Sequence, residues 1–419
     1  TIIFVLNINN SKANTLMDSL NSAYIKNPKL NAERSNMKAS IAEKRESISE
    51  FLPSVTISGY ISEQENTNPG VDTTFEPSQQ SITVEQKLFQ GGEGIANFKK
   101  KQHGESLGKF KLKKTEQEIL LLAAEVHTNL VLSEKKVNIN LMNVDLLERQ
   151  VETDQNRLEK GEINLTDLAQ SESSLAGAKA ELIGAQNELV TSKANFEKTI
   201  GKKAPEQINV TKDINLNLPE SLASAYSISN SENPNLQIAL LEYEQAKLDV
   251  IIAGSELAPS ATLSYERAEQ DDISSTIKER TQQTVTATAS WPLFAGGSNL
   301  FSLKKTQELR NRKELLLEDS KQKASTDVAN AWSTYQSSKS VLESIRSQVK
   351  AAEIANEGIT LEYESGNSRT TLEVIQSRTI LLNSRINLAI SERNFLISQF
   401  NLLSSIGRLT ANQLNLNSN

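Results

Sequence analysis

Four polar side chains stand beside two short breaks in long helical patterns: Asp167, Tyr363, Arg369 and Glu373. The breaks lie at residues 161–164 and 366–369. A guanidinium presents a fork of N–H donors to a carboxylate, and the Tyr363 hydroxyl can donate to Asp167. These residue types therefore predict hydrogen bonds and ion pairs between the two breaks. The alternative is that they are ordinary solvated residues on helical turns.

The sequence lacks the residue patterns of phosphate binding, metal binding and hydrolysis. The glycine run at 91–94 has no Lys-Ser or Lys-Thr pair, and Glu93 would repel a phosphate. His103 and His127 have no spacing that suits a metal site, and the sequence holds no nucleophile elbow. We therefore expect a strand-to-helix turn at the glycine run and a packing or solvent-facing role for His127. We expect no enzyme activity, metal or cofactor.

The composition favours long helices with narrow apolar seams, which bury little surface per residue. Only 37% of the 419 residues are hydrophobic and 5% are aromatic, with a mean hydropathy of −0.42. The net charge of −7, without a basic stripe, gives no reason to expect nucleic acid. The absence of cysteine excludes disulfides and is compatible with the periplasm.

No apolar run in the sequence approaches the ~18–20 residues of a membrane-spanning helix. The apolar stretch at residues 1–6 is typical of a signal-peptide remnant, and Ser11-Lys12-Ala13 could end it, with small residues flanking the cut. We therefore interpret residues 1–14 as a signal remnant, the alternative being a frayed, disordered N-terminus.

The chain repeats itself with a period of about 206 residues. Four landmarks recur in the same order: Asn27-Pro28 as Asn233-Pro234, residues 49–54 as 255–260, residues 88–92 as 293–297, and Ile200-Gly201 as Ile406-Gly407. Solenoid repeats are much shorter, ~20–50 residues. The chain therefore consists of two copies of one large unit, and each copy should build half of a pseudo-symmetric object.

Each copy is expected to contain a helix, a strand pair, a very long helix and a returning helix. The predicted first helices cover residues 16–50 and 236–257, the long helices 94–160 and 298–363, and the returning helices end at Ile200 and Ile406. Some 66 helical residues span ~100 Å. A linker with a short helix at 222–228 joins the copies.

The predicted strands alternate apolar with small hydroxyl residues, the period of a sheet with unlike faces. Polar stretches at 63–80 and 269–280 join the strands of each pair, and Asn68-Pro69-Gly70 signals a turn. We therefore expect one hairpin per copy, at 53–90 and 259–295, each with a loop longer than a simple turn.

Four strands cannot close a barrel and would leave open edges. Alternating apolar and polar faces are typical of outer-membrane barrels, the smallest of which have 8 strands. Three chains would supply twelve strands with cyclic symmetry, whereas a soluble sandwich would lack a second sheet. The residues predicted to face lipid are Val55, Ile57, Ile82, Val84, Leu263 and Val285.

Taken together, the duplicated Leu-Pro-Ser-like and Leu-Phe-x-Gly-Gly motifs and the glycine-containing tips resemble the TolC family of trimeric outer-membrane channels. The resemblance covers residues 15–409. It implies a mainly α chain with a β-hairpin pair, three copies of which form a twelve-stranded transmembrane barrel continued by a periplasmic helical barrel. It also implies a passive conduit for efflux or type I secretion in the outer membrane of a Gram-negative bacterium. The implied partners are a periplasmic adaptor and an inner-membrane transporter of RND or ABC type.

The resemblance implies a periplasmic gate at the tips, carried over by position to Asp167, Tyr363, Arg369 and Glu373. It implies adaptor docking at Gly161, Leu165, Thr166, Gly366, Thr370 and Thr371. Two features depart from the family pattern. Asn367 adds one residue after Gly366, and Gln376 replaces a second acid, which leaves a single acidic ring and weakens the expected cation preference.

We expect a first repeat at 15–201, a linker at 202–233, a second repeat at 234–407 and a tail at 408–419. Two other functions remain open on the residues alone. A periplasmic adaptor also has helical hairpins but is expected to have only one, with a lipoyl-type half-motif. A structural coiled-coil filament would show an unbroken heptad register without strand pairs.

Overall fold

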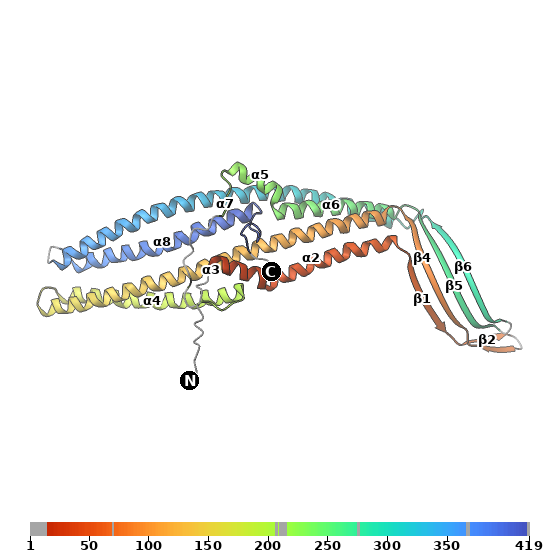
Figure 1. The fold of residues 1–419 in the computed structure, drawn as a ribbon, viewed down its shortest axis with the longest axis horizontal. Coiled ribbons are helices and arrows are strands. Elements are labelled where there is room, and N and C mark those ends of the chain that lie inside the picture. Colours follow the sequence, from red (N-terminus) through yellow and green to blue (C-terminus); the bar gives the residue numbers. More distant parts are fainter. Residues whose placement is uncertain are drawn as a thin grey trace, which may run out of the picture. The chain divides into compact units, whose positions relative to one another are not determined.

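The computed structural model describes residues 15–68, 71–205, 208, 216–274, 277–365 and 369–416, drawn as a ribbon in Figure 1. The chain divides into two compact units, and each draws on both repeats. The helical unit comprises Thr1–Glu33, Leu112–Pro234 and Gln322–Asn419, and the sheet unit comprises Arg34–Lys111 and Asn235–Lys321. The expected signal remnant at 1–14, part of the Asn68-Pro69-Gly70 turn and the tip glycine Gly366 lie outside the described residues.

Helices make up most of the described chain: α1 (Leu16–Lys26), α2 (Pro28–Glu46), α3 (Glu93–Glu159), α4 (Leu165–Ile200), α5 (Leu222–Glu232), α6 (Pro234–Ser255), α7 (Ser298–Glu364) and α8 (Thr371–Ser405). The helices α3 and α7 have 67 residues each and contain no proline, so no residue lacks the N–H that helix propagation needs. None of the described helices is apolar enough over a sufficient length to cross a membrane.

The helix predicted over residues 16–50 is divided in the structure. Asn27 separates α1 from α2 with extended backbone, ψ 123°, because the residue before a proline avoids the helical region. The chain tightens into a 3₁₀ helix over Ser47–Phe51 before the first strand. The prediction of one continuous helix was therefore wrong at Asn27, although the same proline rule was applied to the later helix end.

The sheet unit holds a four-stranded antiparallel sheet in the order β1-β4-β5-β6, formed by β1 (Ser54–Ile61), β4 (Ser78–Gln90), β5 (Ser260–Ser274) and β6 (Ile277–Ser290). A second antiparallel pair joins β2 (Gln64–Asn68) to β3 (Val71–Phe75). The stretches predicted as loops at 63–80 and 269–280 are therefore largely strand. The prediction relied on their polar composition. A strand whose faces are both exposed can form its backbone hydrogen bonds without apolar residues.

The six residues predicted to face lipid share one face of this sheet. Val55 lies opposite Val84, and Ile57 lies opposite Ile82; β5 and β6 continue the first row with Tyr265 and Val285. The other face carries hydroxyl residues, and Ser58 Oγ lies 2.9 Å from Ser81 Oγ. The apolar face is not uniform, because Arg267 lies opposite Ile82.

The helical unit has its main core where α1, α5 and the C-terminal segment meet the middle of the long helices. Here the duplicated Asn-Pro motif has a structural role. Asn27 Nδ2 donates to the Thr199 carbonyl at 3.3 Å, and Asn233 Nδ2 donates to the Ser405 carbonyl at 2.9 Å. Each asparagine thus satisfies a carbonyl at the end of a returning helix, which would otherwise lack an intrahelical partner.

The two returning helices end beside glycines with left-handed backbone, Gly201 at φ +70° and Gly407 at φ +85°. A Cβ on Gly407 would lie 2.3 Å from the Glu232 carbonyl oxygen, whereas one on Gly201 would meet only the Lys26 side chain at 3.4 Å. In the second repeat, the backbone at the end of α8 therefore packs directly against the backbone at the end of α5. Arg408 adds an ion pair to the Glu232 carboxylate at 2.7 Å, which lowers the pKa of Glu232.

His127 is fully buried in this core, at 0% exposure. Its Nδ1 lies 2.8 Å from Ser19 Oγ, and its ring is tilted against that of Phe196. Burial lowers the pKa of His127 to about 4, while the nearby Asp18 acts in the opposite direction. Of the two roles predicted for His127, packing is the one that the structure shows.

Candidate functional site

Both helical tips lie in the helical unit, at the turns from α3 to α4 and from α7 to α8 (Figure 1). At the first turn, Gly161 has left-handed backbone at φ +75°. Its N–H donates to the Leu158 carbonyl and the N–H of Glu162 donates to the Arg157 carbonyl, both at 2.9 Å. These bonds satisfy the last carbonyls of α3, as expected at a glycine helix end.

Asp167 is a helix-capping residue. Its N–H donates to Asn164 Oδ1 at 3.0 Å, and its carboxylate accepts from the Asn164 N–H at 3.3 Å. This reciprocal pair is a capping box that satisfies two otherwise unpaired donors at the start of α4. Within the chain, Asp167 is thus committed to its own turn, and the predicted bond from Tyr363 to Asp167 is not formed.

The second tip repeats this cap 206 residues later. The Glu373 N–H donates to Thr370 Oγ1 at 3.3 Å, and the Thr370 N–H donates to Glu373 Oε2 at 2.8 Å. The bond from the Thr370 backbone, followed by that from Arg369, lowers the pKa of Glu373. Arg369 connects the two sides of the tip, because Nε contacts Glu362 at 2.6 Å and Nη1 contacts Glu373 at 2.9 Å.

Tyr363 makes the described contact that ties the second hairpin to the first near the tips. Its ring is buried at 4% exposure, and its hydroxyl donates to Asp154 Oδ1 at 2.8 Å. The same hydroxyl lies 3.0 Å from Thr371 Oγ1. Burial is the main cause of the raised pKa of Tyr363. The tyrosine therefore donates from α7 to a carboxylate on α3.

Asp154 was not among the predicted site residues, although it is the acceptor at the centre of this cluster. It is 0% exposed and also accepts hydrogen bonds from Gln150 at 2.9 Å and from Ser171 at 2.5 Å. The sequence carried a signal for it. Asp154 continues the helical spacing of the buried residues Val144 and Leu147, so a heptad count would have placed a carboxylate in a seam.

Two arginines surround the Tyr363–Asp154 contact. The Arg157 guanidinium lies 4.4 Å from the centre of the Tyr363 ring, within the range of a cation–π interaction. Arg378, on α8, has its Nη1 atom buried without a hydrogen-bond partner among the described residues. Burial lowers the pKa of Arg378, although Glu364 and Asp154 act in the opposite direction. The cluster thus combines buried carboxylate, phenol and guanidinium groups.

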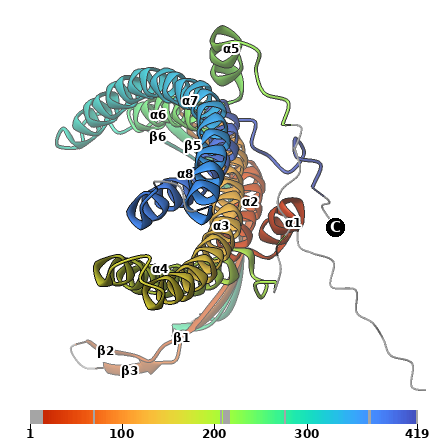
Figure 2. The same ribbon diagram turned by 90° about the vertical axis from the view of Figure 1, so that its left-hand side faces the viewer.

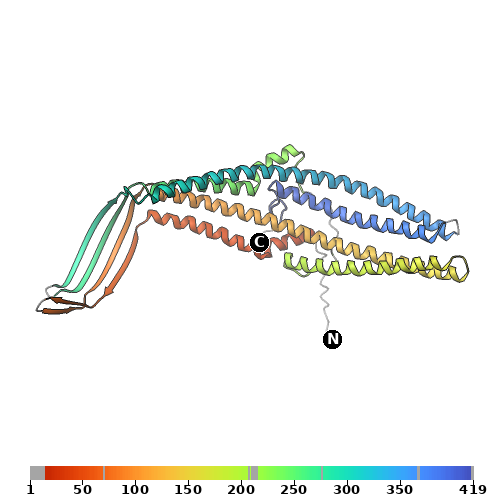
Figure 3. The same cartoon turned by 180° about the vertical axis from the view of Figure 1, so that it is seen from behind.

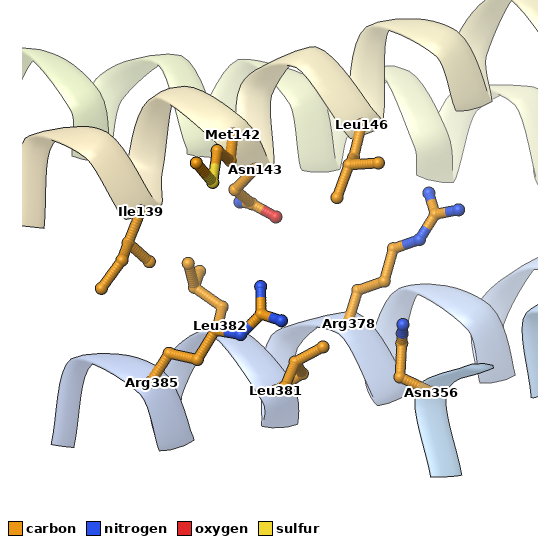
Figure 4. Close-up of a pocket in the computed structure, with 9 residues that line it drawn as sticks. All are labelled: Ile139, Met142, Asn143, Leu146, Asn356, Arg378, Leu381, Leu382 and Arg385. Atoms are coloured by element: carbon orange, nitrogen blue, oxygen red, sulfur yellow. The ribbon is translucent and has the colours of Figure 1, made fainter. Parts of the chain in front are cut away.

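Arg378 also lines a small pocket between α3, α7 and α8 (Figure 4). The pocket has a volume of about 40 Å³, close to the space of one or two water molecules. Apolar side chains from α3 and α8 form most of its wall, and Arg385 at its other end pairs with Glu353 at 2.9 Å. So small a cavity indicates loose packing between the hairpins rather than a substrate site.

The residues predicted to dock a partner differ in their exposure. Gly161, Thr166 and Thr370 are exposed, and Leu165 is 71% exposed. Thr371 is 2% exposed and bound to Tyr363, so its side chain is not offered to solvent. Apolar Leu165 at the very start of α4 is the strongest candidate contact, because a large exposed apolar side chain gains most from being covered.

A family model described as "Outer membrane efflux protein" matches residues 19–202 and again residues 225–408. These two matches cover most of the chain and coincide with its duplication. The chain belongs to the outer membrane efflux protein family. Members of this family are channels and not enzymes, and membership places the chain in the outer membrane, extending into the periplasm. It also decides against an adaptor or a coiled-coil filament.

Individual members of the outer membrane efflux protein family show the same relationship. The outer membrane efflux protein BepC of Brucella suis is 24% identical over 403 residues, spanning 96% of this chain and 87% of BepC. The outer membrane protein TolC of Escherichia coli is 20% identical over 419 residues, spanning 96% and 84%. The CmeC channel of Campylobacter jejuni superposes with a TM-score of 0.84 at 12% identity, spanning 94% and 86%, which shows the shared fold.

Proposed function

We propose that three copies of this chain form a passive exit duct that runs from the periplasm to the cell exterior. The observation that carries this proposal is the four-stranded sheet. Among the described strands β1 and β6 each pair with only one neighbour, and Val55, Ile57 and Val285 are 65%, 76% and 70% exposed. Lipid tolerates no open sheet edge, so β6 of one copy pairs with β1 of the next until twelve strands close.

The energy for export comes from an inner-membrane pump, a drug-efflux transporter or a type I secretion ATPase. The glycine run of this chain lacks the Lys-Ser or Lys-Thr pair of a phosphate-binding loop. A periplasmic adaptor joins pump and duct by contacting the tips. The exposed residues Gly161, Leu165, Thr166 and Thr370 support this contact, since they lie at the ends of the hairpins. Gly366, the other glycine predicted to dock the adaptor, lies outside the described residues.

The tips gate the duct. The buried bond from Tyr363 to Asp154 holds the second hairpin against the first, and Arg369 stiffens the second tip through Glu362 and Glu373. The gate proposed from the sequence thus keeps Tyr363, Arg369 and Glu373 and gains Asp154. Asp167 serves it by capping α4. Breaking the hydrogen bond between the hairpins lets them move apart and widens the opening.

Native mass measurement in mild detergent tests the trimer. We expect a mass of three chains and single-channel currents in planar bilayers. A stable monomer that needs no detergent would refute the proposal.

Matched arginine substitutions test the lipid-facing side of the sheet. Val55→Arg should destabilise the assembled sheet by up to ~2–4 kcal/mol if it lies near the bilayer midplane. Thr56→Arg, one residue along the same strand, points to the opposite face and should be mild. Equal effects of the two changes on assembly, measured by heating the detergent-solubilised protein, would contradict the assigned face.

A further inference from the structure

A lysine stands at the same place behind both junctions between the sheet and a long helix. Lys99 comes six positions after Glu93, the first residue of α3, and Lys304 comes six positions after Ser298, the first residue of α7. Six residues of helix span about 9 Å. The duplication therefore places one lysine in each repeat close to the end of the sheet.

On α7, Lys304 points away from α6, the neighbouring helix of the sheet unit (Figure 2). The α6 side of α7 is marked by Asn299, whose Nδ2 donates to the Glu256 carbonyl at 2.9 Å, and by Lys313, which pairs with Glu242 at 2.6 Å. Successive residues are about 100° apart around a helix, so Lys304 lies about 140° from Asn299 and about 180° from Lys313. Lys304 is exposed and forms no ion pair with a described residue.

On α3, Lys99 likewise lies away from both neighbouring helices of the sheet unit. Lys101 marks the α2 side, because it pairs with Glu43 at 2.9 Å, and Figure 3 shows these two helices side by side. Lys100 marks the α6 side, because it pairs with Asp249 at 2.6 Å. Lys99 is about 160° from Lys101 and about 100° from Lys100. It is exposed and has no ion pair among the described residues.

An exposed apolar residue precedes each of these lysines by one helical turn, on the same helix face. Ile95 on α3 is 58% exposed and Leu300 on α7 is 61% exposed. Before α3, a register shift near the end of β4 places Phe89 opposite Ala261, two residues from Leu263 on the apolar face of the sheet. Apolar strand, apolar helical turn and lysine thus follow one another, in the order in which a bilayer changes from hydrocarbon to polar headgroups.

The direction of α3 and α7 turns Lys99 and Lys304 toward the sheet. The Cα–Cβ bonds of a helix tilt toward its N-terminus, and both helices begin at the sheet. A lysine stem can lie along apolar surface while its ammonium group stays in a polar layer. The headgroup layer of a bilayer is about 5–7 Å thick on each side, so lysines about 9 Å below the helix start can reach it.

We propose that Lys99 and Lys304 each bind the phosphate of an anionic phospholipid in the leaflet that faces the periplasm. The inference rests on the proposed trimeric duct, in which the two lysines of each copy form a ring around the lower edge of the barrel. The occupant is a lipid and not free phosphate, because a single lysine offers only a point charge. The apolar turn beside each lysine adds a surface that acyl chains cover.

The two lipid sites differ in strength. The first turn of α3 carries Glu93, which repels a phosphate, whereas the first turn of α7 has no acidic residue. Glu308 follows Lys304 by one turn, on the side away from the sheet. No carboxylate therefore lies between Lys304 and the start of its helix, and Lys304 is the stronger site.

Quenching of Trp291 fluorescence by brominated lipids tests the site at Lys304. Trp291 is 63% exposed, and its Nε1 donates to the Leu257 carbonyl at 3.1 Å, next to the Glu256 carbonyl that holds the start of α7. The chain has two tryptophans, so a Trp332→Phe background leaves Trp291 alone. In phosphatidylcholine bilayers, brominated phosphatidylglycerol should bind beside Trp291 about fivefold more strongly than brominated phosphatidylcholine, the factor expected for one lysine at an anionic headgroup.

Matched variants assign this preference to one side chain. Lys304→Gln should bring the two lipids to near equality, and Lys304→Arg should keep the preference. Lys323→Gln removes the same charge from an exposed position of α7 about 28 Å farther from the sheet, and it should leave the preference unchanged. Lys99→Gln should also leave the quenching of Trp291 unchanged, because its site belongs to the first repeat.

Native mass spectrometry of the trimer tests both sites together. Trimer released from micelles that contain phosphatidylglycerol should retain two of these lipids per chain. Either Lys99→Gln or Lys304→Gln should remove one of the two, and the double variant should remove both. Equal retention by wild type and the double variant would contradict the inference.

The outcomes separate this inference from the duct itself. Equal quenching by the two lipids in the wild type, or the same ratio in wild type and Lys304→Gln, overturns the lipid site while the duct remains. Displacement of phosphatidylglycerol by inorganic phosphate, where chloride of equal ionic strength has no effect, identifies a phosphate site and also overturns it. If brominated phosphatidylcholine fails to quench Trp291 at all, the sheet does not lie in the bilayer and the duct is refuted.

Discussion

Asn27 and Asn233, 206 residues apart, each donate to a carbonyl at the end of a returning helix. The capping boxes at Asn164 and Thr370, also 206 residues apart, likewise make matching hydrogen bonds. The buried contacts between them differ. Tyr363 of the second repeat donates to Asp154 of the first. His127 is fully buried in the first repeat, whereas Trp332, the equivalent residue 205 positions later, is only partly buried. The hydrogen bonds that satisfy the backbone at helix ends are therefore the same in both repeats, whereas the buried side-chain contacts differ between them.

The helix ends that look alike should respond very differently to one methyl group. Gly407→Ala should cost about 3–4 kcal/mol, because left-handed strain adds to overpacking against the Glu232 carbonyl. Gly201→Ala should cost ~1–2 kcal/mol, since only a side chain must move. Thermal unfolding of the detergent-solubilised protein measures both. Equal losses of stability would contradict the difference in packing around Gly407 and Gly201.

The buried histidine should give the first repeat a pH dependence that the second lacks. The pKa of His127 is about 4 in the folded protein, against 6.5 for a solvent-exposed histidine in the unfolded chain. Because the folded state disfavours the proton, its stability contribution is complete above pH 6.5 and is lost as the pH falls toward 4. The loss is on the order of 3 kcal/mol.

This dependence is measured as unfolding temperature against pH for the wild type and for His127→Gln. The variant should lose the additional decline between pH 6.5 and 4, and the control Ser333→Ala, at an exposed position of α7, should keep it. The charged group that acts on His127 is Asp18 of α1, with Ser19 and Phe196 as its uncharged neighbours. Parallel curves for wild type and His127→Gln would contradict the prediction.

Removing Asp154 should loosen the hairpins more than removing an exposed acid on the same helix. Asp154→Ala leaves the Tyr363 hydroxyl, Ser171 and Gln150 without their acceptor, which costs ~1–3 kcal/mol. Asp145→Ala removes only an exposed pair with Arg149 and should be nearly silent. Hydrogen exchange of the tip amides should rise in the first variant alone.

The proposed gate should open when the hydrogen bond of Tyr363 and the ion pairs of Arg369 are removed together. The double variant Tyr363→Phe with Arg369→Ser should raise single-channel conductance in planar bilayers, because the buried hydrogen bond and the tip ion pairs are both lost. Tyr335→Phe keeps the ring stack on Phe395 and serves as the control. Unchanged conductance in the double variant would place the constriction elsewhere.

The smallest expected effect is a change in ion selectivity, and it should differ between the two capping residues Glu373 and Asp167. Glu373→Ala should reduce cation preference and block by multivalent cations, because it removes the carboxylate that Arg369 and the Thr370 backbone hold ionised. Asp167→Ala breaks the matching cap on α4 and should leave ion selectivity nearly unchanged. Reversal potentials in asymmetric salt measure both variants, and a larger shift from Asp167→Ala would reverse the comparison.

The sequence predicted the architecture well because the duplication and the helical pattern each extend over many residues. The bounds predicted for α3 and α7 agree with the structure to within a residue or two, and the shared face of Val55 and Val84 followed from alternation alone. The predicted polar loop at 269–280 failed because alternation says nothing where both faces of a strand are polar.

The candidate site was less predictable because its acceptor is hidden inside a helix. Asp154 sits among polar neighbours in the sequence and becomes distinct only when the buried seam of α3 is known. Asp167 and Glu373 were recognised as tip acids, but their capping role depends on Asn164 and Thr370 three residues earlier. That spacing was readable from the sequence, whereas the reach of Tyr363 across to another hairpin was not.

The central strand pair has a consequence for the order in which the chain folds. Gln90 of β4 pairs with Ser260 of β5, so this pairing must close a loop of roughly 170 residues, whereas the hairpin of α3 and α4 needs only local contacts. Contacts of short sequence separation form early and distant ones late. The helical hairpins should therefore be complete in the periplasm before the two repeats join their strands, which delays exposure of an apolar sheet until membrane and partner copies are at hand.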